Sequence, residues 1–121
     1  MQRRSLAASF RDAFKGIGHA FLTQRNAKIQ LTVGAVVLIV AAALRVSLGE
    51  LALLLLTSAG VLAAEIANTA VETLVDAFCP SPSESARIAK DAAAGAVLML
   101  AIGSVAVGVC ILGPPLWRLL V

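Results

Sequence analysis

Three long apolar runs dominate the pattern of hydrophobic and polar positions along the chain. They extend from Ile29 to Leu44, from Leu51 to Val75 and from Ala92 to Leu112. A helix of about 20 apolar residues is long enough to span the hydrocarbon core of a bilayer. The pattern therefore predicts an all-α membrane protein whose three transmembrane helices occupy residues 29–47, 50–76 and 90–113.

The segment before the first run has a different periodicity. Apolar side chains recur there at helical spacing, at Phe10, Phe14, Ile17 and Phe21. Arg11 and Lys15 lie off that line, as on an amphipathic helix. Residues 1–22 are therefore expected to form a helix on the membrane surface, with its basic side chains near anionic headgroups. A polar collar, Thr23 to Gln30, then leads into the first transmembrane helix.

The second apolar run contains a stripe of polar side chains. Glu65, Asn68, Glu72 and Asp76 fall on a helix face roughly 80° wide. The stripe follows an apolar stretch, Leu51 to Ala64, that contains no charged residue. A charge at bilayer depth costs at least about 2.5 to 3.5 kcal/mol. A functional role with a cation, a proton or a partner is therefore favoured over a purely structural one.

The depth of the stripe suggests how its acids divide their roles. Counting about 1.5 Å per residue from Glu50 places Glu65 just inside the cytoplasmic boundary of the hydrocarbon layer, Glu72 on it and Asp76 beyond it. Glu65 and Glu72 are separated by two helical turns, roughly 10 Å. They are too far apart to chelate one ion together. We expect one carboxylate to act as a base and the other as a metal ligand.

Composition and charge are consistent with one small membrane domain over residues 1–121. The chain has 60% hydrophobic residues and a mean hydropathy of +0.93, which excludes a soluble domain. Six of its ten Lys and Arg precede the first apolar run, and two more, Arg87 and Lys90, follow the second. The positive-inside rule thus predicts a cytoplasmic N-terminus, a cytoplasmic loop over residues 77–88 and an outside C-terminus. A capping box at Ser81 and Glu84 is expected in that loop.

The sequence lacks the motifs of several common active sites. The chain has no glycine-rich nucleotide loop of the P-loop or Rossmann type, no Ser-His-Asp set and no Cys-His metal cluster. Lys90 and Asp91 are expected at the same membrane level as Glu72, where Lys can hold a phosphate and Asp a metal. A base, a metal site and a cation suffice for phosphoryl transfer. Because the base would lie within the lipid layer, the acceptor should be a lipid alcohol.

Two other classes of function remain open from the residues alone. In a small proton-coupled or ion-coupled transporter, Glu65 would be a membrane-buried carrier. That reading does not explain the acids and the Lys gathered at the cytoplasmic level. An inactive membrane scaffold is the third possibility. Transport predicts flux across vesicles without ATP, and a scaffold predicts no binding of Mg²⁺ and ATP.

The polar stripe also carries a resemblance to a known family. The pattern Glu65-x-x-Asn68-Thr69-Ala70-x-Glu72-x-x-x-Asp76, followed by Ala89-Lys90-Asp91, resembles the signature of the bacterial integral-membrane diacylglycerol kinase family, which includes undecaprenol kinases. The resemblance extends to Phe14-Lys15-Gly16 and Arg25-Asn26. It implies a homotrimer with shared active sites in the bacterial plasma membrane. It also implies Mg-ATP as donor and diacylglycerol as acceptor, giving phosphatidic acid, with undecaprenol as the alternative.

The resemblance further implies roles for individual residues. Glu65 would be the catalytic base and Glu72 a metal ligand, while Lys90 and Asp91 would contact the nucleotide, supported by Asn68 and Asp76. Asn26 and Lys15 would join Glu65 at the lipid. Many members have a Glu metal ligand where this chain has Gln24, and His or Glu where it has Gln30. Gln24 would still be a metal ligand through its carbonyl oxygen, but because it brings no negative charge, the metal is expected to depend mainly on Glu72 and the ATP phosphates.

Overall fold

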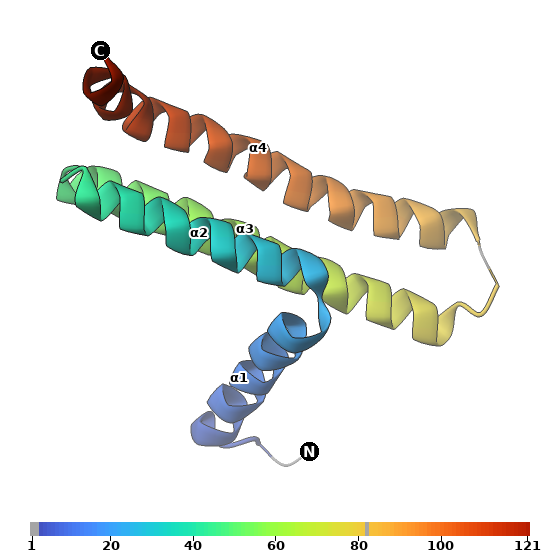
Figure 1. Cartoon of the computed structure of the whole chain (residues 1–121). Helices are drawn as coiled ribbons and strands as arrows, with labels where there is room; N and C mark the ends of the chain where they lie inside the picture. Colours follow the sequence, from blue (N-terminus) through green and yellow to red (C-terminus); the bar gives the residue numbers. More distant parts are fainter. Residues whose placement is uncertain (1–2, 82) are drawn as a thin grey trace.

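The computed structural model describes residues 3–81 and 83–121, and these residues form four α-helices and no strand (Figure 1). The helices are α1 (Leu6–Thr23), α2 (Arg25–Ala43), α3 (Leu48–Phe78) and α4 (Glu84–Leu120). Helices α2, α3 and α4 have 19, 31 and 37 residues, and each is long and apolar enough to cross a membrane. The expected all-α fold with three candidate membrane spans is confirmed.

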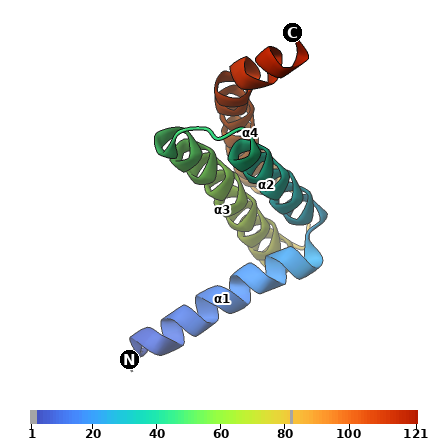
Figure 2. The same cartoon turned by 60° about the vertical axis from the view of Figure 1, so that its left-hand side comes forward.

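Helix α1 projects away from the other three helices (Figures 1 and 2). Ser5 caps its first turn, where the Ser5 hydroxyl accepts a hydrogen bond from the Ala8 N–H at 3.2 Å. Gln24 interrupts the helix with an extended backbone, at φ −102° and ψ 118°, so α2 starts in a new direction at Arg25. Phe10 and Phe14 are exposed on α1. Its place on a membrane surface stays a prediction.

Helix α4 begins inside the segment that was expected to be a loop. The loop was predicted over residues 77–88, but α3 continues to Phe78 and α4 starts at Glu84. The cap is Ser83, whose hydroxyl accepts a hydrogen bond from the Ala86 N–H at 3.1 Å. The capping box expected at Ser81 and Glu84 was therefore wrong, since the cap lies two positions later and its third residue is Ala86. Both Ser81 and Ser83 offer a capping hydroxyl, and the sequence did not distinguish them.

The turn between α2 and α3 is closed by local hydrogen bonds. Arg45 adopts a left-handed backbone with φ 55°. The N–H groups of Arg45 and Val46 donate to the carbonyls of Ala42 and Ala41, the pattern of a Schellman motif. On the other side, Ser47 and Glu50 cap each other's backbone N–H in a capping box. The two helices are consequently held as an antiparallel hairpin.

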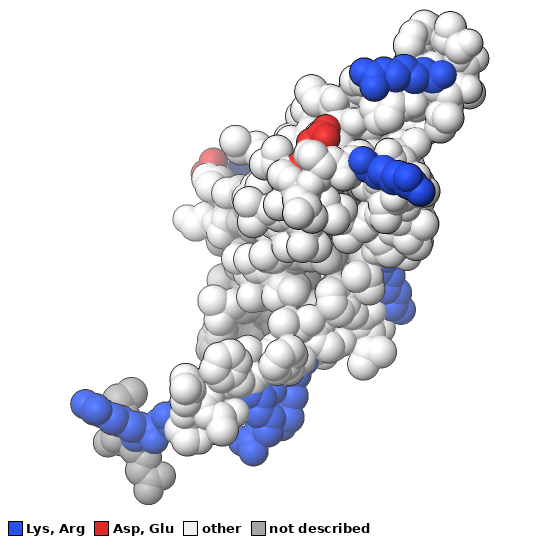
Figure 3. All heavy atoms as spheres, turned by 90° about the vertical axis from the view of Figure 1, so that its left-hand side faces the viewer, with Lys and Arg blue, Asp and Glu red and all other residues white. Residues whose placement is uncertain are grey.

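Helix α3 packs against both α2 and α4. A small core of Ala41, Leu54 and Ile111 lies near the α2–α3 turn. Small residues allow close approach, since a Cβ added at Gly34 would lie 3.5 Å from the Ser58 Cβ. Much of the rest of the surface is apolar and exposed, and Figure 3 shows Lys and Arg in a few separate groups around it. Such a surface suits contact with lipid.

Candidate active site

A cavity of about 390 Å³ lies among α2, α3 and α4, and we call it the carboxylate pocket. Its polar lining comes from Asn26 and Gln30 on α2 and from Glu65, Asn68 and Glu72 on α3. Its wall on α4 is made of Ala94, Val97, Leu98 and Ala101. The helical spacing of the stripe on α3 puts its first three polar residues on the same cavity.

Glu65 is the most deeply buried acid of the described residues, with a relative exposure of 6%. Its backbone carbonyl accepts a hydrogen bond from the Thr69 hydroxyl at 3.0 Å. Its carboxylate forms no ion pair within residues 3–81 and 83–121. A buried carboxyl without a cation is unfavourable unless it serves a ligand or holds a proton. Both states suit a group that takes a proton from a bound hydroxyl.

Asn68 and Glu72 form the second part of the pocket. The Asn68 Nδ2 donates a hydrogen bond to the Glu72 Oε1 at 3.1 Å. In the described part of the chain, the buried Asn68 Oδ1 has no hydrogen-bond partner. A buried carbonyl oxygen without a donor needs an explanation, and a bound cation supplies one. The amide orientation thus leaves an acceptor oxygen beside the carboxylate.

These oxygens fit Mg²⁺ as it is usually bound with nucleotides. Mg²⁺ takes one or two carboxylates together with phosphate oxygens and water, and it prefers oxygen ligands. Within residues 3–81 and 83–121, no group of three or more His, Cys, Asp or Glu could hold a metal alone. Glu72 and the Asn68 Oδ1 therefore suit a metal that arrives with a phosphate ligand better than a metal held by protein alone.

A second cavity of about 730 Å³ lies where α3 meets α4, and we call it the ion-pair pocket. The Lys90 Nζ lies 2.9 Å from the Asp76 Oδ1 and joins the two helices. The Arg87 Nη1 lies 3.2 Å from the Asp91 Oδ2, one turn apart on α4. Asp91 thus pairs with Arg87, and Lys90 pairs with Asp76. The pocket offers cations for phosphate and remains open to water.

The predicted site residues fall into two groups and two outliers. Glu65, Asn68, Glu72 and Asn26 share the carboxylate pocket, and Asp76, Lys90 and Asp91 share the ion-pair pocket. Gln24 and Lys15 line neither of these two pockets. Gln24 is half-buried at the junction of α1 and α2, and Lys15 is exposed on α1. The structure thus brings together seven of the nine predicted residues.

Several further polar residues line these pockets without having been predicted as site residues, and two of them lie one helical turn from a predicted residue on the same helix. Gln30 lines the carboxylate pocket, and Arg87 lines the ion-pair pocket. Each has a signal in the sequence, because Gln30 is four residues from Asn26 and Arg87 is four residues from Asp91. On a helix, that spacing places both residues of a pair on one face.

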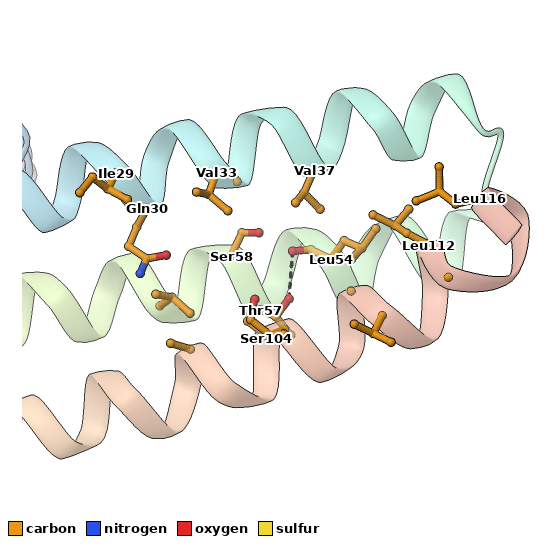
Figure 4. Close-up of a pocket in the computed structure, with 17 residues that line it drawn as sticks. Ile29, Gln30, Val33, Val37, Leu54, Thr57, Ser58, Ser104, Leu112 and Leu116 are labelled. Atoms are coloured by element: carbon orange, nitrogen blue, oxygen red, sulfur yellow. Dashed lines mark hydrogen bonds between the residues drawn. The ribbon is translucent and has the colours of Figure 1, made fainter. Parts of the chain in front are cut away.

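A third cavity of about 520 Å³ continues from the carboxylate pocket toward the α2–α3 turn, and we call it the apolar groove (Figure 4). Ile29, Gln30 and Ala101 line both cavities. Its few polar side chains include Ser58, Ser104 and Thr57, whose hydroxyl donates to the Leu54 carbonyl at 3.1 Å. A cavity rich in carboxylate thus adjoins one lined mainly by hydrocarbon.

Known proteins resemble this chain over most of its length. A family described as prokaryotic diacylglycerol kinase matches residues 11–112. A diacylglycerol kinase from Synechocystis sp. is 47% identical over 118 residues, which cover 97% of this chain and 67% of the relative. An undecaprenol kinase from Bacillus subtilis is 35% identical over 108 residues, which cover 89% of this chain and 88% of the relative.

Proposed function

The chain belongs to the prokaryotic diacylglycerol kinase family, and from this premise we propose that it uses Glu65 to transfer the γ-phosphate of ATP to the hydroxyl of a membrane lipid. It is a membrane lipid kinase and therefore a phosphotransferase. The observation that carries the proposed site is the buried Glu65, which shares a cavity with Glu72 and the unpartnered Asn68 Oδ1. The apolar groove beside that cavity suits a lipid acceptor.

The transfer itself needs one proton movement and one exchange of bonds. The acceptor hydroxyl lies beside Glu65, and its oxygen attacks the γ-phosphorus of ATP. As the new oxygen–phosphorus bond forms, the hydroxyl proton passes to the Glu65 carboxylate. The bond from the γ-phosphorus to the bridging oxygen breaks, and ADP leaves with its electron pair. Glu65 must therefore be ionised before transfer and release its proton afterwards.

Mg²⁺ and the nucleotide would be held between the two pockets. Glu72 and the Asn68 Oδ1 would hold Mg²⁺, which offsets the negative charge of the phosphates when bound. Lys90 would turn from Asp76 to a phosphate, and Asp91 and Asp76 would orient the cations of the ion-pair pocket. Asn26 would contact the lipid near Glu65. Gln24 and Lys15 lie outside these pockets, so we assign them no direct contact with Mg²⁺, the nucleotide or the lipid.

Two lipid alcohols are candidate acceptors. Diacylglycerol, which would give phosphatidic acid, is supported by the name of the relative that is 47% identical. Undecaprenol is supported by the name of the relative that is 35% identical. Both present one hydroxyl to Glu65 and differ in the number and length of their hydrocarbon tails. The choice between them therefore depends on the cavity that receives the tail.

The proposal also includes an orientation and an assembly. The N-terminus and the ion-pair pocket would face the cytoplasm and the C-terminus the outside of the bacterial plasma membrane, which the distribution of Lys and Arg supports. A homotrimer with shared sites is supported by the family resemblance. The many exposed apolar side chains on α4 leave room for helices of neighbouring copies.

The decisive experiment measures transfer of labelled γ-phosphate from ATP to diacylglycerol and to undecaprenol in mixed micelles with Mg²⁺. Wild type is compared with Glu65→Gln and with the matched control Glu50→Gln. Glu50 lies on the same helix but caps the far end, where Gln can accept the same hydrogen bond from the Ser47 N–H, so its change removes a charge and no site group. We expect label in lipid for wild type and the control, and a loss of about 100-fold or more for Glu65→Gln.

Two results would contradict the proposed mechanism. Equal loss in Glu65→Gln and Glu50→Gln would indicate a folding effect in place of a base. Cation or proton flux through wild-type vesicles without ATP, combined with no label in either lipid, would favour the transporter. In that second case Glu65 would be a carrier and the ion-pair pocket would have no nucleotide to hold.

A further inference from the structure

Helix α4 contains two consecutive prolines near its end, Pro114 and Pro115. Because proline has no N–H, the carbonyls of Cys110 and Ile111 lack their usual helical donors. Proline within a helix bends it. The end of α4 accordingly turns away from the axis of the rest of the helix (Figures 1 and 2). The family match ends at residue 112, before this bend.

The bend lies at the membrane boundary opposite the ion-pair pocket. The Lys90–Asp76 pair places Lys90 on α4 at the level of Asp76 on α3. Glu72, which the helical count along α3 places at the edge of the hydrocarbon layer, is one turn further in. On α4 the same edge is near Ala94. A layer of about 30 Å takes about 20 residues of helix and therefore ends near Pro114.

The packing of α4 gives the same level independently. Ile111 packs with Ala41 and Leu54, next to the turn that joins α2 to α3. Glu50, from which the hydrocarbon layer was counted, caps α3 at that turn. The carbonyls of a helix point toward its C-terminal end. The two carbonyls without helical donors therefore point toward the nearby membrane surface, where water can satisfy them.

Residues 116–121 follow the bend, and we call them the post-proline segment. The side chains of Trp117, Leu119 and Leu120 are 68%, 72% and 83% exposed. At about 100° per residue, the five apolar side chains of the segment cover an arc of about 200°, and Arg118 alone lies outside that arc. An apolar arc with a cation on the opposite side is the pattern of a helix that lies in a membrane interface.

The lipid interface suits this segment better than water or hydrocarbon does. Water would leave Trp117 and its apolar neighbours exposed, which is unfavourable. Hydrocarbon would bury the charge of Arg118, which forms no ion pair within residues 3–81 and 83–121. At the interface, Trp finds its preferred level and Arg can bind a lipid phosphate. Figure 3 faces this end of the molecule, where uncharged surface predominates.

We propose that the post-proline segment lies along the membrane surface opposite the ion-pair pocket, with its apolar side chains where headgroups meet acyl chains and Arg118 on a lipid phosphate. The segment is an anchor that fixes the depth of α4, whose other end carries Lys90. It takes no part in the transfer of phosphate, so its placement is tested without kinase activity. A helix of a second copy is the competing occupant of its apolar face.

The test uses the fluorescence of Trp117. This is the only tryptophan of the chain, which has no tyrosine, so the emission reports on the segment alone. The full chain is reconstituted in vesicles of phosphatidylcholine and phosphatidylglycerol. Its emission is quenched by lipids brominated near the top or near the end of the acyl chains, and by iodide in the water. A second protein, Trp117→Phe with Val121→Trp, moves the reporter about 6 Å along the same face.

We expect both reporters at one depth, with shallow bromines quenching more than deep ones and iodide quenching less than it quenches free tryptophan. Pro114→Ala with Pro115→Ala restores the missing N–H groups and straightens α4. The two reporters should then differ in depth by about 6 Å, with severalfold stronger iodide quenching at position 121. Gly103→Ala, at an exposed position on the same helix, is the matched control. Unchanged depths in the proline variant would refute the role of the bend.

Three results without the proline substitutions would overturn the proposal. Iodide quenching at position 121 as strong as that of free tryptophan would mean that the segment projects into water. Strongest quenching by deep bromines would place it in hydrocarbon. Protection from bromines and iodide that is lost on dilution in lipid would assign the apolar face to a second copy.

The contact with phosphate has its own test. Arg118→Gln should move Trp117 deeper, because no charge then holds the segment at the headgroups. The ratio of quenching by deep bromines to quenching by shallow bromines should therefore rise. An unchanged ratio would refute the phosphate contact.

Discussion

The carboxylate pocket and the ion-pair pocket each contain an acid of α3, and the surroundings of these two acids differ. Glu65 is buried and has no cation partner within the described residues, whereas the Asp76 side chain is 67% exposed and bound to Lys90. Exposed ion pairs contribute about 0 to 1 kcal/mol and are easily opened. Burial therefore restricts the position of the Glu65 side chain. The exposed pairs can rearrange at little cost in free energy.

Substitutions that change the side chains of Glu65 and Asp76 by one methylene each should show the largest difference in kcat between the two pockets. Glu65→Asp draws the carboxylate back from the pocket, and a displacement of about 1 Å can lower a rate about 100-fold. Asp76→Glu makes the reverse change at an exposed ion pair, where Lys90 can follow it, and should change kcat less than about threefold. Steady-state kinetics with saturating ATP measure both. Similar losses in the two variants would remove the distinction between the pockets.

Removal of the unpartnered amide oxygen should produce the next largest effect. Asn68→Ala deletes the Oδ1 and the hydrogen bond to Glu72. Loss of such supporting groups lowers metal affinity about 10-fold to 100-fold. We expect a higher Mg²⁺ concentration for half-maximal rate, with recovery of the rate at high Mg²⁺. Thr73→Ala, at an exposed position on the same helix, is the control. A low rate that excess Mg²⁺ does not restore would contradict the metal assignment.

Loss of the cation in the ion-pair pocket should act on the nucleotide. Lys90→Met removes one charge-assisted contact with phosphate and should raise the KM for ATP about tenfold, with a smaller change in kcat. Added salt should raise the KM of wild type and have less effect on the variant. Lys28→Met, at an exposed position on α2, is the matched control. An unchanged KM for ATP would exclude Lys90 from the nucleotide site.

The smallest effect is expected at Arg87. Arg87→Gln breaks the pairs with Asp91 and Glu84, both of which lie on the exposed first turns of α4. Pairs of this kind on a helix surface contribute about 0.3 to 0.5 kcal/mol. The thermal midpoint should therefore change little, and the KM for ATP should change less than about threefold. A loss as large as that of Lys90→Met would mean that Arg87 contacts the phosphates directly.

The sequence predicted the helices well because each long element has one dominant signal. Uninterrupted apolar runs specify membrane-length helices, and the spacing of Glu65, Asn68 and Glu72 specifies a shared face. The ends of the helices were harder to predict. The start of α4 at Glu84 depends on which of two neighbouring serines turns its hydroxyl to the backbone, and both have the required chemistry.

The partners of the charged residues could not be obtained from the sequence. Lys90 was expected to hold a phosphate, and the packing of α4 on α3 places it against Asp76. The spacing of residues along one helix gives no information on how far Lys90 lies from a side chain of another helix. Gln24 shows the same limit, since the family resemblance implied a metal ligand at its position, while the break between α1 and α2 places it at a junction. The positions of both Lys90 and Gln24 depend on how one helix lies relative to the next.

The closed turn between α2 and α3 has a consequence for how this chain enters a membrane during synthesis. Every atom that closes the turn belongs to residues 41–50, so it can form as soon as that segment is made. The two helices can then insert as one hairpin. Gln30 and Glu65 belong to facing sides of that hairpin and line one cavity. Gln30 and Glu65 would thus enter the cytoplasmic half of the bilayer turned toward each other and away from the lipid.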